Sequence, residues 1–302
     1  MGLNLSGMTT ETRNPRTMQL DQMSPLEIMT VMNEEDARVP LAIAKCLPQI
    51  AQAVTWAAEA FEKGGRLFYM GAGTSGRLGV LDAAECPPTF GVPKEMVVGL
   101  IAGGEKAFIE AVEGAEDSRE LAVEDLKAHS LTADDFVVGI AASGRTPYVL
   151  GGLDYAKSVG CHTAAIACNI GSAIGKAAEL AIEVNCGPEV LTGSTRLKSG
   201  TAQKLILNMI STGSMVRTGK AYQNLMVDVQ QTNEKLHTRA ENIVIDATGV
   251  EREKARAAID AAGGSVKTAI TMLLADCDAA EAARRLERAH GHVREAIRLE
   301  VL

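Results

Sequence analysis

The sequence predicts an α/β fold: a doubly wound, five-stranded parallel sheet with N-terminal helices and a small C-terminal helical domain. Five short β-rich segments are nearly continuous apolar runs, which is typical of parallel strands covered on both faces. Helical stretches separate most of these segments, as the crossover connections of a parallel sheet require. The 302 residues suffice for one large α/β unit with an appendage, or for two domains.

The N-terminal part is expected to be helical. Ser24 can cap a helix that begins at Pro25, and Glu27 completes a capping box. A second helical stretch, residues 40–62, is expected to be broken or kinked at Pro48 and to end at two glycines. The strands are expected at residues 67–70, 96–101, 136–140, 163–167 and 180–184, and an amphipathic helix at about 200–218.

The C-terminal part changes in character. After a polar stretch that runs to His237, Ala-rich helical segments begin at about Asn242 and are punctuated by glycines. Their spacing looks like that of a ubiquitin-associated (UBA-like) three-helix fold. We therefore expect three parts: a helical segment over residues 1–56, a sheet domain over 57–240 and a helical domain over 241–302.

Composition excludes several classes of function. The net charge is -8 and aromatic residues make up only 3%, which argues against nucleic acid and anionic membranes as partners. The N-terminus has no basic region followed by an apolar stretch, so we expect a cytoplasmic protein. The six cysteines form no C-x-x-C pair, which disfavours a disulfide framework or a zinc site. No metal is expected.

Three loops rich in Gly, Ser and Thr follow predicted strands. Backbone N–H groups at a helix N-terminus, surrounded by hydroxyls, form a cradle for an anion such as phosphate. Because parallel strands end at one edge of the sheet, we expect the three loops to lie together. They contain Gly73, Thr74 and Ser75 after the first strand, Ser143, Gly144, Arg145 and Thr146 after the third, and Ser194 and Thr195 after the fifth.

Other interpretations of these loops stay open. Gly, Ser and Thr are common in tight turns between strands and helices. Residues 71–76 also match the G-x-G-x-x-G pattern of dinucleotide sites, but no acidic residue follows at the ~20-residue spacing that ribose binding uses. No G-x-x-x-x-G-K-[ST] motif occurs, which disfavours an ATPase.

Two carboxylates are candidates for acid–base chemistry. Glu85 precedes Pro87 and Pro88, which are expected to end the first crossover helix, and the dipole at a helix C-terminus favours a protonated carboxyl group. Glu116 lies among other acidic residues after the second strand, and their repulsion also favours protonation. The alternative is a solvated acidic helix face. Neither residue alone identifies a reaction.

Five motifs carry a family resemblance. They are GAGTSGRLG at 71–79, AECPPT at 84–89, EAVEGAEDS at 110–118, ASGRTP at 142–147 and NEKLH at 233–237. With them the chain resembles the N-acetylmuramic acid 6-phosphate etherases of the sugar isomerase (SIS) superfamily. The likeness runs in order from about Ser24 to the C-terminal helices.

The resemblance implies a SIS fold and an activity in bacterial cell-wall recycling. Such an enzyme cleaves the D-lactyl ether of its sugar phosphate substrate, giving N-acetylglucosamine 6-phosphate and D-lactate without metal or cofactor. On this pattern Glu85 protonates the departing lactate and Glu116 acts at C2. The superfamily also suggests a homodimer, with His237 contributed across the interface; the alternative for His237 is a packing or capping role.

Two competing functions remain open. An aldose–ketose isomerase of the same superfamily would use the same loops and a base at C2, but would release no lactate. A non-catalytic sugar-phosphate sensor, like the glucokinase regulatory protein, would bind without reacting. That sensor carries two SIS units, whereas this chain has strand segments for one, so its length favours the enzyme.

Overall fold

All five predicted strands form, and they make one parallel sheet. A computed structural model describes residues 8–110, 112–229 and 234–299. The strand order is β2-β1-β3-β4-β5, so the chain first winds to one side of β1 and then to the other. The predicted doubly wound α/β fold is therefore confirmed. The strands are β1 (Leu67–Gly71), β2 (Val97–Ile101), β3 (Phe136–Ala141), β4 (His162–Ala167) and β5 (Leu180–Glu183).

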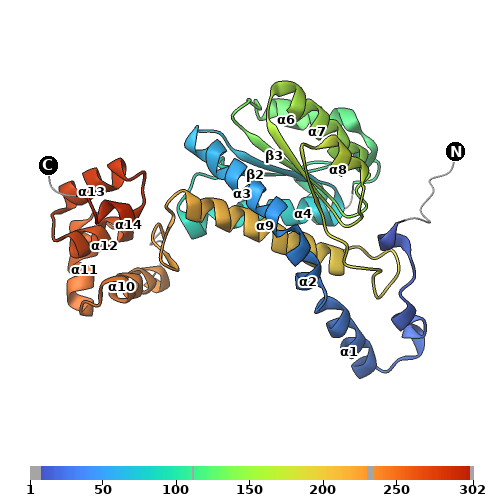
Figure 1. Ribbon diagram of the computed structural model, residues 1–302, viewed down its shortest axis with the longest axis horizontal. Coiled ribbons are helices and arrows are strands. Elements are labelled where there is room, and N and C mark those ends of the chain that lie inside the picture. Colours follow the sequence, from blue (N-terminus) through green and yellow to red (C-terminus); the bar gives the residue numbers. More distant parts are fainter. Residues whose placement is uncertain (1–7, 111, 230–233, 300–302) are drawn as a thin grey trace. The chain divides into compact units, whose positions relative to one another are not determined.

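Helices cover both faces of this sheet, as the continuous apolar strands predict (Figure 1). One face packs Phe68 and Met70 against Leu126, Tyr148 and Leu153 in a fully buried core. The helices on that face are α6 (Arg119–Ala128), α7 (Pro147–Val159) and α8 (Ala173–Ala177). On the other face lie α3 (Leu47–Glu62), α4 (Gly73–Phe90) and α9 (Lys198–Arg217).

The N-terminal helices begin and break where the sequence predicts. Ser24 and Glu27 form the predicted capping box. The second helical stretch is interrupted just before Pro48, which lies in the first turn of α3, where it loses no helical hydrogen bond. Gly64 follows α3 in a left-handed conformation, with φ of 78°. The elements here are 3-10 turns at Thr9–Glu11, Pro15–Thr17 and Leu20–Gln22, then α1 (Pro25–Asp36), α2 (Val39–Ile43) and a 3-10 turn at Ala44–Cys46.

One predicted helix end is wrong. Pro87 and Pro88 do not end α4, which continues to Phe90 and stops at Gly91 with φ of 63°. The φ angle that proline imposes is itself helical, and the Gly91 amide still closes the last turn on the Pro87 carbonyl. Glu85 therefore lies more than one turn from the helix end, where the helix dipole has little effect.

The chain forms two compact units. The first contains the described residues up to Ala84 and Glu95–Ser211, and the second contains Glu85–Lys94 and the residues from Thr212 onward. The predicted division at residues 57 and 241 stays a prediction. Two short elements follow β2 in the first unit, α5 (Lys106–Ile109) and a 3-10 turn at Ala115–Asp117. No helix among the described residues is both long and apolar enough to cross a membrane.

The second unit has its own helical core, which includes Val244, Ile259 and Ile270. The first C-terminal helix begins at Glu234, eight residues before the predicted start, so the last residues of the polar stretch, up to His237, are helical. The elements are a small antiparallel pair, β6 (Ala221–Tyr222) and β7 (Leu225–Met226), then α10 (Glu234–Thr248), α11 (Arg252–Ala261), α12 (Val266–Ala275), α13 (Ala279–Arg288) and α14 (Val293–Ala296). Ala111 and Asn233, which belong to two of the family motifs, lie outside the described residues.

Candidate functional site

The strand order places a natural binding position between β1 and β3. Connections leave these two neighbouring strands toward opposite sides of the sheet, and such switch points leave a crevice beyond the strand ends. The first and second Gly/Ser/Thr loops leave the sheet at these two strand ends. The predicted cradle therefore lies where a parallel sheet most often binds its ligand.

The first loop connects β1 to α4 and leaves no room for a side chain at Gly76. A Cβ atom on Gly76 would lie 2.6 Å from the Gly71 carbonyl oxygen and 2.7 Å from the Ile101 side chain. Gly73 begins α4 with φ of 51° and is exposed, so its backbone is open to a ligand. Ser75 is buried instead, and its hydroxyl donates to Gln203 of α9 at 3.0 Å. Within this loop, Gly73 and Thr74 are the more accessible binding candidates.

The second loop connects β3 to α7, and Asn169 supports it through hydrogen bonds to its backbone. The Asn169 amide donates to the carbonyl oxygens of Ala142 and Ser143 at 3.2 and 3.4 Å, and to the Thr10 hydroxyl at 3.0 Å. Gly144 has φ of 73°, and a Cβ atom there would lie 2.4 Å from Ser172. Asn169 and Thr10 belong to no recognisable motif, so the sequence alone does not predict their roles.

The open side of the second loop carries the predicted binding groups. The Ser143 hydroxyl accepts a hydrogen bond from the Arg145 amide at 3.3 Å. Thr146 is the N-cap residue of α7, but its hydroxyl makes no capping hydrogen bond to that helix. Ser143, Arg145 and Thr146 are all half-buried. Hydroxyl groups and backbone amides thus gather at the start of α7, as an anion cradle requires.

The third loop meets the first at Gly200, near the start of α9. A Cβ atom on Gly200 would lie 3.6 Å from both the Thr74 methyl carbon and the Thr195 carbonyl oxygen. The second loop is tied to the same place, because the Cys168 amide donates to Ala142 and the Cys168 thiol contacts the Ser199 carbonyl at 3.8 Å. The structure therefore brings the three predicted loops together at one sheet edge.

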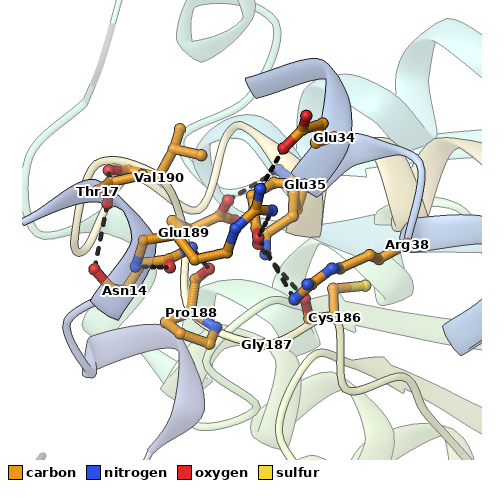
Figure 2. Close-up of polar contacts among 12 residues, drawn as sticks. Asn14, Thr17, Glu34, Glu35, Arg38, Cys186, Gly187, Pro188, Glu189 and Val190 are labelled. Atoms are coloured by element: carbon orange, nitrogen blue, oxygen red, sulfur yellow. Dashed lines mark hydrogen bonds and ion pairs between the residues drawn. The ribbon is translucent and has the colours of Figure 1, made fainter. Parts of the chain in front are cut away.

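The N-terminal segment fixes the path of the third loop (Figure 2). Asn14 donates to the Pro188 carbonyl at 3.2 Å, and the Thr17 hydroxyl donates to the Val190 carbonyl at 2.8 Å. Glu189 is fully buried and accepts hydrogen bonds at 2.9 Å from the amides of Lys198 and Ser199, the first two residues of α9. Those two amides are thus occupied by a carboxylate, so an anion at this loop would rely on the Ser194 and Thr195 hydroxyls.

A buried ion pair connects the start of α9 to α1 (Figure 2). Lys198 donates to Glu35 of α1 at 2.6 Å and to the Cys186 carbonyl at 2.9 Å, and both charged side chains are only 1% exposed. Arg16 and Arg38 also pair with Glu35, at 2.8 and 3.4 Å. Burial opposes ionisation of Glu35, but the hydrogen bonds from Lys198 and Arg16 outweigh it and hold its pKa below the ordinary value.

Glu116 lies beside the first loop, in a pocket of about 210 Å³. It is exposed and belongs to the short 3-10 turn that follows Gly114, whose φ is 78°. The pocket brings the predicted base next to Gly73, the first residue of α4 and part of the predicted phosphate cradle. The lining residues all belong to the first unit; they are Ala72, Gly73, Arg77, Ala102, Ala107, Val112, Glu113, Gly114 and Glu116.

The two remaining predicted site residues lie in the second unit. Glu85 is an exposed residue of α4, and it is not among the residues that line the Glu116 pocket. His237 is an exposed residue in the first turn of α10. Their catalytic and binding roles stay predictions.

The parallel sheet, its switch point and the converging loops define a SIS domain protein. A SIS domain model matches residues 119–212, and a model of the glucokinase regulatory protein N-terminal SIS domain matches residues 49–157. The chain belongs to the N-acetylmuramic acid 6-phosphate etherase family. It is 63% identical to the protein of that name from Exiguobacterium sp., over 97% of this chain and 100% of the relative. It is 61% identical to that from Pectobacterium atrosepticum, over 98% and 97%.

A solved structure agrees on the fold. Phosphoheptose isomerase from Neisseria gonorrhoeae superposes with a TM-score of 0.50 at 17% identity, covering 63% of this chain and 98% of that one. At this identity the likeness supports the SIS architecture alone. It supplies no choice between an isomerase and an etherase.

Proposed function

We propose that this chain cleaves the D-lactyl ether of N-acetylmuramic acid 6-phosphate, giving N-acetylglucosamine 6-phosphate and D-lactate. Full-length identity of about 60% to relatives with that name supports the proposal. The structural observation that carries it is the pocket that is lined both by Glu116 and by Gly73 of the first Gly/Ser/Thr loop. A base next to a phosphate cradle suits removal of a proton from a phosphorylated sugar.

The chemistry proceeds as an elimination followed by addition of water. In the open-chain sugar the C2 proton is α to the C1 aldehyde, so Glu116 removes it and an enolate forms. The C3–O bond then breaks, and Glu85 protonates the departing lactate oxygen. Water adds to C3 of the unsaturated aldehyde, and a proton returns to C2. The enzyme is thus a carbon–oxygen lyase that acts as a net hydrolase, and its six free cysteines suit a reducing cytoplasm.

The function is tested by D-lactate release from N-acetylmuramic acid 6-phosphate, compared with the same sugar without phosphate. We expect release from the phosphorylated sugar, and a strong rise in KM when the phosphate is absent. Ser143→Ala should also raise KM for the phosphorylated sugar, by about 10- to 100-fold, since it removes a hydroxyl donor to a charged group. Ketose formation without lactate would identify an isomerase instead. An unchanged KM in Ser143→Ala would contradict the proposed cradle.

We also propose a homodimer in which His237 of each chain completes the site of its partner. Large apolar side chains on the N-terminal helices support an interface, because Leu26 and Leu41 are 77% and 69% exposed in the single chain. Sedimentation velocity should show a dimer at the concentrations used in the assay. His237→Ala should lower the activity without dissociating the dimer. An active monomer would contradict the proposal.

A further inference from the structure

Arg77 is a charged residue of the Glu116 pocket to which the predicted chemistry gives no role. It lies on α4, one turn after Gly73, and it is half-buried. Its Nε donates to the Phe108 carbonyl at 2.7 Å, and its Nη2 donates to the Ala107 carbonyl at 2.9 Å. These carbonyls belong to the four-residue helix α5.

The two bonds use only one edge of the guanidinium group. Arginine carries five N–H donors in a planar fork, and these two hydrogen bonds do not use the N–H groups of Nη1. Because Arg77 also lines the Glu116 pocket, its side chain is anchored at a wall that a substrate would contact. An anchored guanidinium is preorganised to bind a second planar acceptor, above all a carboxylate.

The charges around this pocket are unbalanced. Glu113 and Glu116 both line it, and among the described lining residues Arg77 is the one with a positive charge. An anionic group of a ligand that entered this pocket would be repelled by the two glutamates. Arg77 is the lining side chain that offsets this repulsion, so it would decide where such a group lies.

We propose that Arg77 binds the carboxylate of the lactyl substituent of the substrate. The inference rests on the proposed function, in which the substrate carries two acidic groups, the 6-phosphate and the lactyl carboxylate. The phosphate binds at the three Gly/Ser/Thr loops. The lactyl group is attached at C3, next to the C2 proton that Glu116 removes, so its carboxylate lies within a few bonds of the reacting atoms. The carboxylate thus enters the same pocket as Glu116, where Arg77 is its charge-complementary partner.

This role distinguishes substrate from product. N-acetylglucosamine 6-phosphate has the same phosphate and the same C2 centre but no lactyl group. Arg77 therefore adds affinity for the ether substrate without adding affinity for the sugar product. The released lactate would lose this contact once it leaves the pocket.

The test compares Arg77→Gln and Arg77→Lys with the unmodified chain. The measured quantities are KM for N-acetylmuramic acid 6-phosphate, KM for its lactyl amide analogue, and Ki for N-acetylglucosamine 6-phosphate. We expect Arg77→Gln to raise KM for the acid by about 10- to 100-fold and to leave KM for the amide and Ki nearly unchanged. Arg77→Lys, which keeps the charge, should retain part of the preference for the acid. Lys106→Gln removes an exposed charge of α5 outside the pocket lining and should leave all three values unchanged.

Other outcomes would overturn the proposal. If Arg77 only fixes the segment that carries Glu116, both Arg77 variants would impair acid and amide substrates equally and lower kcat for each. If Ki for the sugar phosphate rises together with KM, Arg77 binds the phosphate instead. Failure of the proposed function would look different, since the unmodified chain would then release no lactate.

Discussion

Glu116→Gln is expected to lose both D-lactate release and exchange of the substrate's C2 hydrogen with solvent, by the ~10²–10⁴-fold typical of a missing general base. The reason is that both processes begin with the same proton transfer. Glutamine keeps the size of the side chain but cannot accept the proton. The measurement is NMR of the sugar C2 position in D₂O alongside a lactate assay. Asp117→Asn, a change at the next exposed carboxylate along the chain, should leave both rates intact.

Glu85→Gln is the second arm of this experiment and should fail at a later step. Because enolate formation does not need the acid, C2 exchange should continue while lactate release almost stops. If Glu85→Gln stops exchange and Glu116→Gln retains it, the two roles are reversed. If both variants release lactate at the full rate, neither glutamate is catalytic and the assigned chemistry is wrong.

Lys198→Met is expected to destabilise the sheet unit by about 3 kcal/mol, at the lower end of the cost of breaking a buried ion pair. The change leaves Glu35 buried, with Arg16 and Arg38 as its remaining cationic partners. Urea unfolding followed by the fluorescence of Trp56, the one tryptophan of the chain, measures the loss. Trp56 reports on this unit because it stacks on His162 at 4.4 Å and contacts Phe136.

The control for this prediction is the double variant Glu35→Met with Lys198→Met. It removes both buried charges, so it should recover much of the stability lost in the single variant. The ion pair also predicts a pH dependence. Since the pKa of Glu35 is lowered in the folded protein, its contribution is present at neutral pH and is lost as the pH falls through that lowered value. Single variants whose effects simply add would show that the two side chains are not coupled.

The sequence by itself determined the fold and the position of the three Gly/Ser/Thr loops. Apolar runs without alternation required strands covered on both faces, and β1 to β5 lie within a residue or two of their predicted bounds. The capping box at Ser24 and the glycines after α3 set helix ends for local reasons. Loops that follow parallel strands must share one sheet edge, so the meeting of the three Gly/Ser/Thr loops followed from their order along the chain.

Local sequence signals predicted the wrong helix bounds at two places, the end of α4 and the start of α10. Pro87 and Pro88 are helix breakers by propensity, yet α4 continues past them because their φ angles are helical and the last turn still closes at Gly91. The polar residues from Glu234 onward gave little helical signal, but they form the first turns of α10. Its buried residues Ala240, Ile243 and Val244 pack into the helical core of the second unit, and this packing decides its conformation.

Only the tertiary structure decided which side chains serve the loops. Asn169 supports the second loop, Glu189 occupies the first amides of α9, and Lys198 reaches Glu35 across 163 positions of sequence. The pocket that joins Arg77 to Glu116 likewise depends on how α4 and the segment after β2 fold against each other. No spacing or periodicity reports such contacts, because hydrogen bonds and ion pairs depend on distance in space. The sequence thus predicted the loops that form the candidate site. Packing between distant segments decided which charged side chains lie around them.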